Sequence, residues 1–167
     1  GGLGISAMMH GYLAFDASGE LLVPFRTWRN TNTGAAAAEL TQKLGFNFPL
    51  RWSASHLYQA VLDSEPHLAA LASINTLAGF VHWKLTGERV LGVGDASGMF
   101  PIDPAARDYD AAMLEHFTAL VRERAPHLDA AALLPRVAVA GADAGVLTAS
   151  GAALLDPSGT IQPGIPV

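Results

Sequence analysis

Cysteine is absent from the 167 residues, and the chain also lacks long apolar runs and long basic runs. Without cysteine it has neither a disulfide framework nor a thiolate zinc site, which is compatible with the cytoplasm, where we expect the protein. No apolar run reaches the roughly 18 residues of a membrane helix, so we expect no membrane partner. The net charge of −5 argues against a nucleic-acid partner, because phosphate binding needs clustered lysine and arginine.

Several catalytic and nucleotide-binding motifs are missing too. The segment Gly92–Gly98 is similar to a dinucleotide fingerprint, but its third glycine comes one place too late, which favours a tight strand-to-helix turn. Ser97 does not sit in a Gly-x-Ser-x-Gly elbow, because position 95 is aspartate. The six histidines contain no His-x-x-x-His pair, and no Gly-x-x-x-x-Gly-Lys-Ser/Thr loop is present. We therefore expect no metal site and no P-loop.

The residues that are present predict one folded domain. Half of them are apolar and 15% are charged, which excludes a disordered chain and provides for a sizeable core. The sequence begins Gly1-Gly2-Leu3 without an initiator methionine and stops at Gly164–Val167, where a strand pattern begins. We expect a fragment of a longer protein.

Strand and helix patterns are interleaved along the chain, which indicates an α/β fold. Apolar runs predict strands over 3–9, 12–15 and 89–94, and a turn at 16–20 that leads to a returning strand at 21–23 of an antiparallel ribbon. Helical spacing predicts helices over 35–44, 53–62, 67–71, 74–85, 109–124, 130–134 and 147–155, with Gly45 and Gly87 as stops.

Met9 and His10 follow an apolar run and precede Gly11. A half-buried histidine at a strand end explains this pattern as well as a functional one does. In the functional interpretation, His10 lies at the mouth of a cleft, where a neutral imidazole both donates and accepts a hydrogen bond. That chemistry suits a hydroxyl-rich ligand.

Trp28, Arg29 and Asn30 form a second candidate, on a polar loop. An indole face can cover the apolar side of a sugar ring while the arginine and the asparagine supply hydrogen bonds. The alternative is a loop that one aromatic side chain anchors on the core. Both interpretations stand at this point.

The order of several motifs resembles the sugar-binding half of the FGGY carbohydrate kinase family, to which xylulokinases, ribulokinases and glycerol kinases belong. The resemblance extends along nearly the whole chain. Its motifs are Met9-His10-Gly11, the turn Asp16–Gly19, Trp28-Arg29-Asn30, Leu85-Thr86-Gly87-Glu88, Asp95-Ala96-Ser97-Gly98-Met99 with Asp103, Tyr109-Asp110, Gly145–Thr148 and Gly164–Val167.

The resemblance implies a fold and a set of site residues. The fold would be a partial ribonuclease H-like (actin-like ATPase) domain, a mixed sheet flanked by helices, with residues 1–167 forming part of the N-terminal kinase domain. The sugar-binding residues would be Met9, His10, Trp28 and Asn30, with Asp95 as support. Arg51 and Trp52 match a loop near the substrate in relatives.

The departures from the family concern catalysis. The family's phosphate-binding Asp-x-Gly-Thr hairpin and its catalytic aspartate have no counterpart in these residues, so none of them is assigned a catalytic role. We expect ATP and Mg²⁺ to serve the parent kinase and not to be held by this fragment alone, which we expect to be inactive. A non-catalytic carbohydrate-binding module and a plain structural domain are the alternatives.

The resemblance also bears on partners. The expected ligand is a small sugar or polyol, and Met9-His10 leans toward a ketopentose, because glycerol kinases place an Arg-Glu pair there. The loop Trp28–Thr31 departs from the Asp-Gly-Arg sequence of xylulokinases. If the first strands of the central sheet are missing, an unpaired strand edge is exposed, and we expect a homo-oligomer or a partner chain to cover it.

Overall fold

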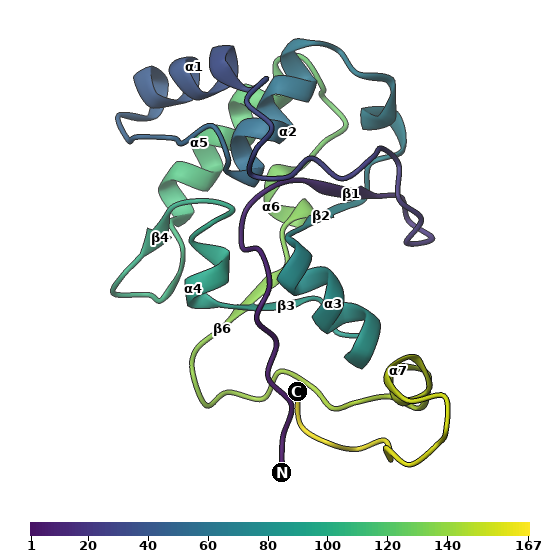
Figure 1. Ribbon diagram of the computed structural model, residues 1–167. Helices are drawn as coiled ribbons and strands as arrows, with labels where there is room; N and C mark the ends of the chain where they lie inside the picture. Colours follow the sequence, from purple (N-terminus) through teal and green to yellow (C-terminus); the bar gives the residue numbers. More distant parts are fainter.

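The computed structural model describes residues 1–167 and combines helices with three short strand pairs (Figure 1). Strand β1 (Leu13–Phe15) pairs antiparallel with β2 (Ser73–Asn75), and β4 (Ile102–Asp103) pairs antiparallel with β5 (Asp108–Tyr109). Strand β3 (Val90–Gly92) runs parallel to β6 (Arg136–Ala138). The mixture of parallel and antiparallel pairs between helices confirms the α/β class.

Seven α-helices and one 3₁₀-helix surround these pairs. In Figure 1, α1, α2 and α5 lie together at one end, whereas α7 and both chain termini lie at the other. Two helices end at a glycine with positive φ, Gly45 at 64° and Gly87 at 80°, as the sequence predicts. The helices are α1 (Gly34–Leu44), α2 (Ser53–Leu62), η1 (Pro66–Ala70), α3 (Leu77–Thr86), α4 (Val93–Ala96), α5 (Ala111–Arg122), α6 (Ala130–Leu133) and α7 (Ala149–Leu155).

The main core is a cluster of 23 buried residues between α1, α2 and α5 and the strands beside them. Aromatic rings form its centre: the ring of Phe100 lies 5.8 Å from that of Phe48 and 5.3 Å from that of Phe117. A second cluster contains only Leu85 and two partners near α7. The end of the molecule with α1, α2 and α5 therefore has the larger apolar core.

The predicted strand over 3–9 does not form. This segment is extended, but only two backbone hydrogen bonds hold it, from Leu3 N–H to the Pro166 carbonyl (2.8 Å) and from Ala78 N–H to the Met8 carbonyl (3.2 Å). A strand requires a ladder partner, and none of the other strands runs beside these residues. The apolar pattern thus correctly predicted an extended segment, but it could not show that no neighbouring strand pairs with it.

Two predicted helices begin later than expected, each behind a capping side chain. Ile74 belongs to β2, and the Thr76 hydroxyl accepts from Gly79 N–H (3.1 Å) to start α3. Likewise the Asp110 carboxylate accepts from Met113 N–H (2.9 Å) and starts α5. These caps satisfy N–H groups that have no partner within the helix. Each helix therefore begins at its cap and not at the earlier apolar residues that share the helical spacing.

The turn at 16–20 forms around the Asp16 carboxylate, which accepts from Ser18 N–H and Glu20 N–H. The returning strand shortens to one bridge between Phe15 and Leu21, so β1 takes β2 as its main partner. The strand predicted at 89–94 also shortens, because α4 begins directly after β3 in the tight turn expected there. No helix combines the length and apolar character that crossing a membrane requires.

Candidate functional site

His10 lies in a turn that two glycines make possible. Gly11 has a φ of +106°, and a Cβ there would lie 2.5 Å from the Arg26 carbonyl oxygen. A Cβ at Gly98 would lie 2.3 Å from the Met9 carbonyl oxygen and 2.7 Å from Nδ1 of His10. The segment after α4 therefore packs directly against Met9 and His10, which are both partly buried.

The contact with Gly98 sets the proton position on the His10 ring. Nδ1 lies 3.3 Å from the Gly98 carbonyl oxygen, which can only accept, so Nδ1 carries the proton. Partial burial lowers the pKa of His10; the bond to Gly98 opposes this shift and the positive charge of Arg51 adds to it. The ring is thus neutral at pH 7, and Nε2, which makes no hydrogen bond within the chain, remains an acceptor for a hydroxyl group.

The segment before α2 joins His10 to the polar loop. Gly11 N–H donates to the Arg51 carbonyl (3.0 Å), and the Ser53 hydroxyl donates to the Gly11 carbonyl (2.6 Å). One residue earlier, the Leu50 carbonyl accepts from the hydroxyl of Thr33, at the end of the polar loop (2.6 Å). Residues 50–53 accordingly contact both candidate segments, and the place of Arg51 and Trp52 near a substrate stays a prediction.

A single antiparallel bridge joins the segments that carry Trp28 and His10. Tyr12 and Arg26 exchange backbone hydrogen bonds of 2.8 Å and 3.2 Å in an antiparallel bridge. His10 precedes Tyr12 by two residues and Trp28 follows Arg26 by two, so the bridge brings the turn that carries His10 and the loop that carries Trp28 into neighbouring positions. The ladder ends at the bridge because the Gly11 N–H bonds to Arg51 instead.

The Trp28 side chain is 49% exposed, and the Arg29 guanidinium lies 5.2 Å from its ring centroid. The Asn30 side chain accepts from Asn32 N–H (3.1 Å), which leaves its amide group without a hydrogen bond in the chain. An exposed aromatic face beside an uncommitted amide can contact both the apolar and the hydroxyl-bearing parts of a sugar. The same geometry is compatible with an ordinary surface loop.

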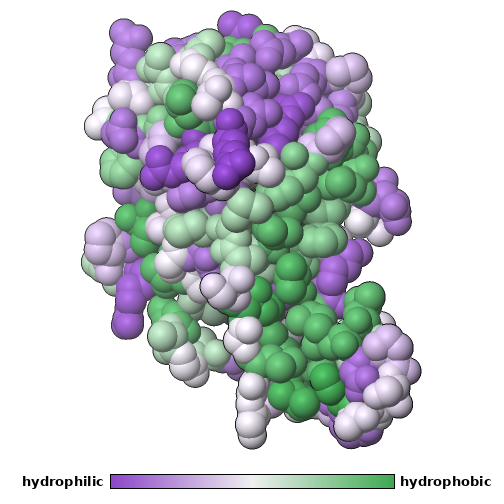
Figure 2. Space-filling view, in the orientation of Figure 1, coloured by the Kyte–Doolittle hydropathy of each residue, from purple (hydrophilic) through white to green (hydrophobic).

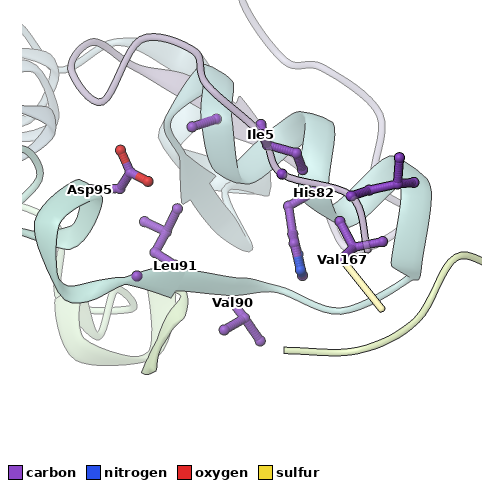
Figure 3. Close-up of a pocket in the computed structure, with 10 residues that line it drawn as sticks. Ile5, His82, Val90, Leu91, Asp95 and Val167 are labelled. Carbon is purple, nitrogen blue, oxygen red and sulfur yellow. The ribbon is translucent and has the colours of Figure 1, made fainter. Parts of the chain in front are cut away.

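Asp95 occupies a different place from the other candidates. It lines a hollow of about 150 Å³ with Leu91, His82 and Ile5, at the opposite end of the hollow from His82 (Figure 3). Burial raises the pKa of the Asp95 carboxyl. It is connected to His10 only through Gly98, whose N–H donates to the Asp95 carbonyl (3.0 Å) and whose own carbonyl lies 3.3 Å from His10 Nδ1. The predicted role of Asp95 as support for the sugar-binding residues is therefore not backed by a direct contact with His10.

Sequence reasoning missed a buried group of polar side chains next to β1. Tyr12 and His56 are both fully buried, and their rings stack with centroids 6.3 Å apart. His67 Nε2 lies 2.9 Å from the Tyr12 hydroxyl. Periodicity could not reveal this group, because His56 and His67 stand among apolar residues on helical segments. The only indication in the sequence was the arginine at position 26. Its carboxylate partner comes from a distant part of the chain, so the sequence alone did not identify it.

These residues do not fit a magnesium-nucleotide site by themselves. No group of three or more His, Asp or Glu side chains is arranged to hold a metal ion anywhere in residues 1–167. Asp95 lies among mainly apolar side chains with no second carboxylate in its hollow. A hard cation such as Mg²⁺ needs several oxygen ligands, which a single carboxylate does not provide.

The fold is that of the N-terminal part of carbohydrate kinases with an actin-like ATPase domain. The xyloylose kinase from Brucella ovis matches with a TM-score of 0.73 and 25% identity, over 92% of this chain and 31% of that chain. The xylulose kinase from Rhodospirillum rubrum has a TM-score of 0.72 and 23% identity, over 94% and 32%. The Plasmodium falciparum glycerol kinase with ADP has a TM-score of 0.65 and 16% identity, over 94% of this chain and 31% of that chain.

The chain belongs to the FGGY family of carbohydrate kinases: the family's N-terminal domain matches all of residues 1–167. It spans about a third of the length of the solved structures described above. No curated protein sequence matches it. The resemblance that the motifs suggested is thus confirmed for the family and for the fold, and the site residues stay predictions.

Proposed function

We propose that the chain is the sugar-binding part of an ATP-dependent kinase that phosphorylates a hydroxyl group of a sugar or polyol. The observation that carries the proposal is the His10 ring, which partial burial favours in its neutral form and whose Nδ1 is bonded to Gly98, so that Nε2 is open as a hydroxyl acceptor. The Tyr12–Arg26 bridge supports the proposal further, because it joins this segment to the loop of the exposed Trp28, whose ring offers an aromatic surface. Acceptor and aromatic face together suit a small polyhydroxylated ligand.

A ketopentose is the substrate that we favour. Met9 and His10 support it, since glycerol kinases of this family carry a charged pair at that place. The names of the two bacterial structures, which describe those proteins as xylulose-type kinases, point the same way. The Trp28–Thr31 loop differs from the xylulokinase sequence, so a related ketose or polyol is tested alongside.

In this proposal the residues bind and orient the sugar, and they take no part in proton transfer. His10 accepts a hydroxyl hydrogen at Nε2, Trp28 covers the apolar face, and Asn30 donates from its amide group. ATP and Mg²⁺, which the family uses, supply the phosphoryl group and its charge neutralisation when bound to the parent protein. This chain alone has no metal-holding cluster and is expected to be inactive.

The test compares the full-length protein with residues 1–167. Each is incubated with ATP, Mg²⁺ and a panel of pentoses, ketoses and polyols, and phosphorylated product is measured. We expect the full-length protein to phosphorylate a ketopentose and the isolated chain to give no product. A full-length protein that binds a sugar without phosphorylating it would indicate a carbohydrate-binding module instead, and product from the isolated chain would contradict the predicted inactivity.

A further inference from the structure

Arg26 connects the two candidate sugar-binding segments to the turn that follows α2. Its backbone forms the bridge to Tyr12, two residues from His10, while Trp28 follows two residues later. Its guanidinium lies 5.5 Å from the Tyr12 ring centroid and donates to both carboxylate oxygens of Glu65, from Nη2 to Oε2 and from Nη1 to Oε1, the latter at 2.9 Å. Two parallel hydrogen bonds of this kind fix orientation as well as distance.

Glu65 is itself held firmly. Its N–H donates to the Ala60 carbonyl (3.0 Å) at the end of α2, and its carbonyl accepts from Leu68 N–H (3.2 Å) in η1. The side chains of Arg26 and Glu65 are only 15% and 21% exposed. The carboxylate that receives Arg26 is therefore largely buried and belongs to a turn whose backbone is bonded to both α2 and η1.

A second connection closes the network on Tyr12. The Tyr12 hydroxyl lies 2.9 Å from His67 Nε2, and His67 Nδ1 faces the Glu65 carboxylate at 3.3 Å, without the geometry of a hydrogen bond. Burial raises the pKa of Tyr12, so its hydroxyl keeps its proton and donates to Nε2. Tyr12 is thus fixed at its ring, at its hydroxyl and at its backbone.

A buried charged network is a poor way to gain stability, because apolar residues of the same volume often stabilise a fold as well or better. What such a network provides is geometry, through directional bonds that tolerate little displacement. Here the directional bonds converge on the one bridge that sets the Trp28 loop against the His10 turn.

We propose that Arg26 and Glu65 are positioning residues, which hold the loop that carries Trp28 beside the turn that carries His10, in the arrangement that sugar binding requires. The link to sugar binding rests on the proposed function, whereas the role of the pair in holding the Tyr12–Arg26 bridge does not. Arg26 and Glu65 act through the Tyr12–Arg26 bridge and do not touch the sugar. Loss of the guanidinium–carboxylate pair loosens the bridge and weakens sugar binding, while the chemistry of bound sugar is preserved.

The experiment uses Arg26→Gln and Glu65→Gln in the full-length kinase. We expect KM for the sugar to rise about tenfold or more while kcat changes by less than about twofold, the pattern of lost ground-state binding. Hydrogen–deuterium exchange should quicken about tenfold at the amides of Tyr12 and Arg26, and stay unchanged in α5. Arg26→Lys keeps the charge without the fork and should restore part of the affinity.

Arg122→Gln is the matched control. It removes an exposed pair in which Nη2 of Arg122, on α5, lies 3.0 Å from Oδ2 of Asp129, and it should alter neither KM nor the exchange rates.

If Arg26→Gln does not fold, Glu65→Gln, which keeps the side-chain shape, tests the positioning role instead. Unchanged exchange at both amides would overturn the positioning role. Faster exchange with an unchanged KM would overturn its link to the sugar. A wild-type protein that phosphorylates no sugar contradicts the proposed function alone, and the exchange data still decide the positioning role.

Discussion

The two ends of the molecule are held in different ways. At the end with α1, α2 and α5, a 23-residue apolar cluster with packed aromatic rings underlies the elements that carry His10. At the end with α7, three buried residues form a small cluster, and one backbone hydrogen bond joins the two chain ends, from Leu3 N–H to the Pro166 carbonyl. Figure 2 shows the second difference: on this face, hydrophilic residues gather near the first end, and hydrophobic ones spread over the middle and the second end.

The comparison indicates which part of the chain is complete as a folded unit. The first end buries most of its aromatic residues, apart from Trp28 and Phe46, and presents polar groups at its surface, as a folded domain does. The second end leaves the extended residues 3–9 without ladder partners beside an apolar hollow. An apolar surface next to unpaired backbone is typical of a face that meets another part of a protein.

The largest expected effect comes from Phe100→Ala in the main core. Phe100 is fully buried and contacts the rings of Phe48 and Phe117, so its loss should lower the free energy of unfolding by about 3–5 kcal/mol. Leu147→Ala, equally buried in the small cluster, should lower it by less than about 1 kcal/mol, because α7 opens locally. Urea unfolding measures both, and equal losses would refute the difference between the two ends.

Acid should destabilise the first end through His56. Burial, with a smaller effect from Arg26, lowers the pKa of this ring to about 4 from the ordinary 6.5, and neither ring nitrogen has a hydrogen-bond partner. Between these values the unfolded chain binds a proton that the folded chain does not. Stability therefore falls as pH falls from 6.5 to 4, with a total loss on the order of 3 kcal/mol.

His56→Leu should flatten this part of the stability–pH profile, measured by urea unfolding at pH 7, 6, 5 and 4. His116→Leu is the matched control, since His116 is exposed on α5. Identical slopes for His56→Leu and the wild type would show that His56 is not the group responsible. The slope that remains should come from His10 and His67, whose pKa burial also lowers, and near pH 4 from Glu65, whose pKa the hydrogen bond to Arg26 lowers.

A smaller effect concerns the second end. The isolated chain should self-associate through the unpaired segment Gly4–Met9, and sedimentation should show association that increases with concentration. Ile5→Lys places a charge at this edge and should reduce the association, whereas Leu50→Lys, at an exposed position before α2, should not. A clean monomer at high concentration, without binding of a dye for exposed apolar surface, would contradict the expectation.

The sequence allowed the helices to be predicted well and the strand partners poorly. Helical spacing and the glycine stops identified α1 and α2 almost to the residue, because these signals are local. The partner of β1 could not be read in this way, since β2 lies some 60 positions away and pairing depends on the whole fold. Residues 3–9 failed as a strand for the same reason.

For the candidate site, the sequence pointed to His10 and Trp28 but not to what holds them. Gly98 looked like part of a turn, and only the packing against His10 shows why a side chain there would collide. Glu65 had no signal at all, because its partner Arg26 comes 39 positions earlier. Long-range polar contacts of this kind have no periodicity in the sequence.

The most direct test of the central claim is a titration of the full-length kinase with its sugar, repeated for His10→Ala and Trp28→Ala. We expect each change to raise the Kd about tenfold, or about 1.4 kcal/mol, with His116→Ala as a control that binds like the wild type. Unchanged affinity in both variants would contradict the assignment of this face as the sugar site.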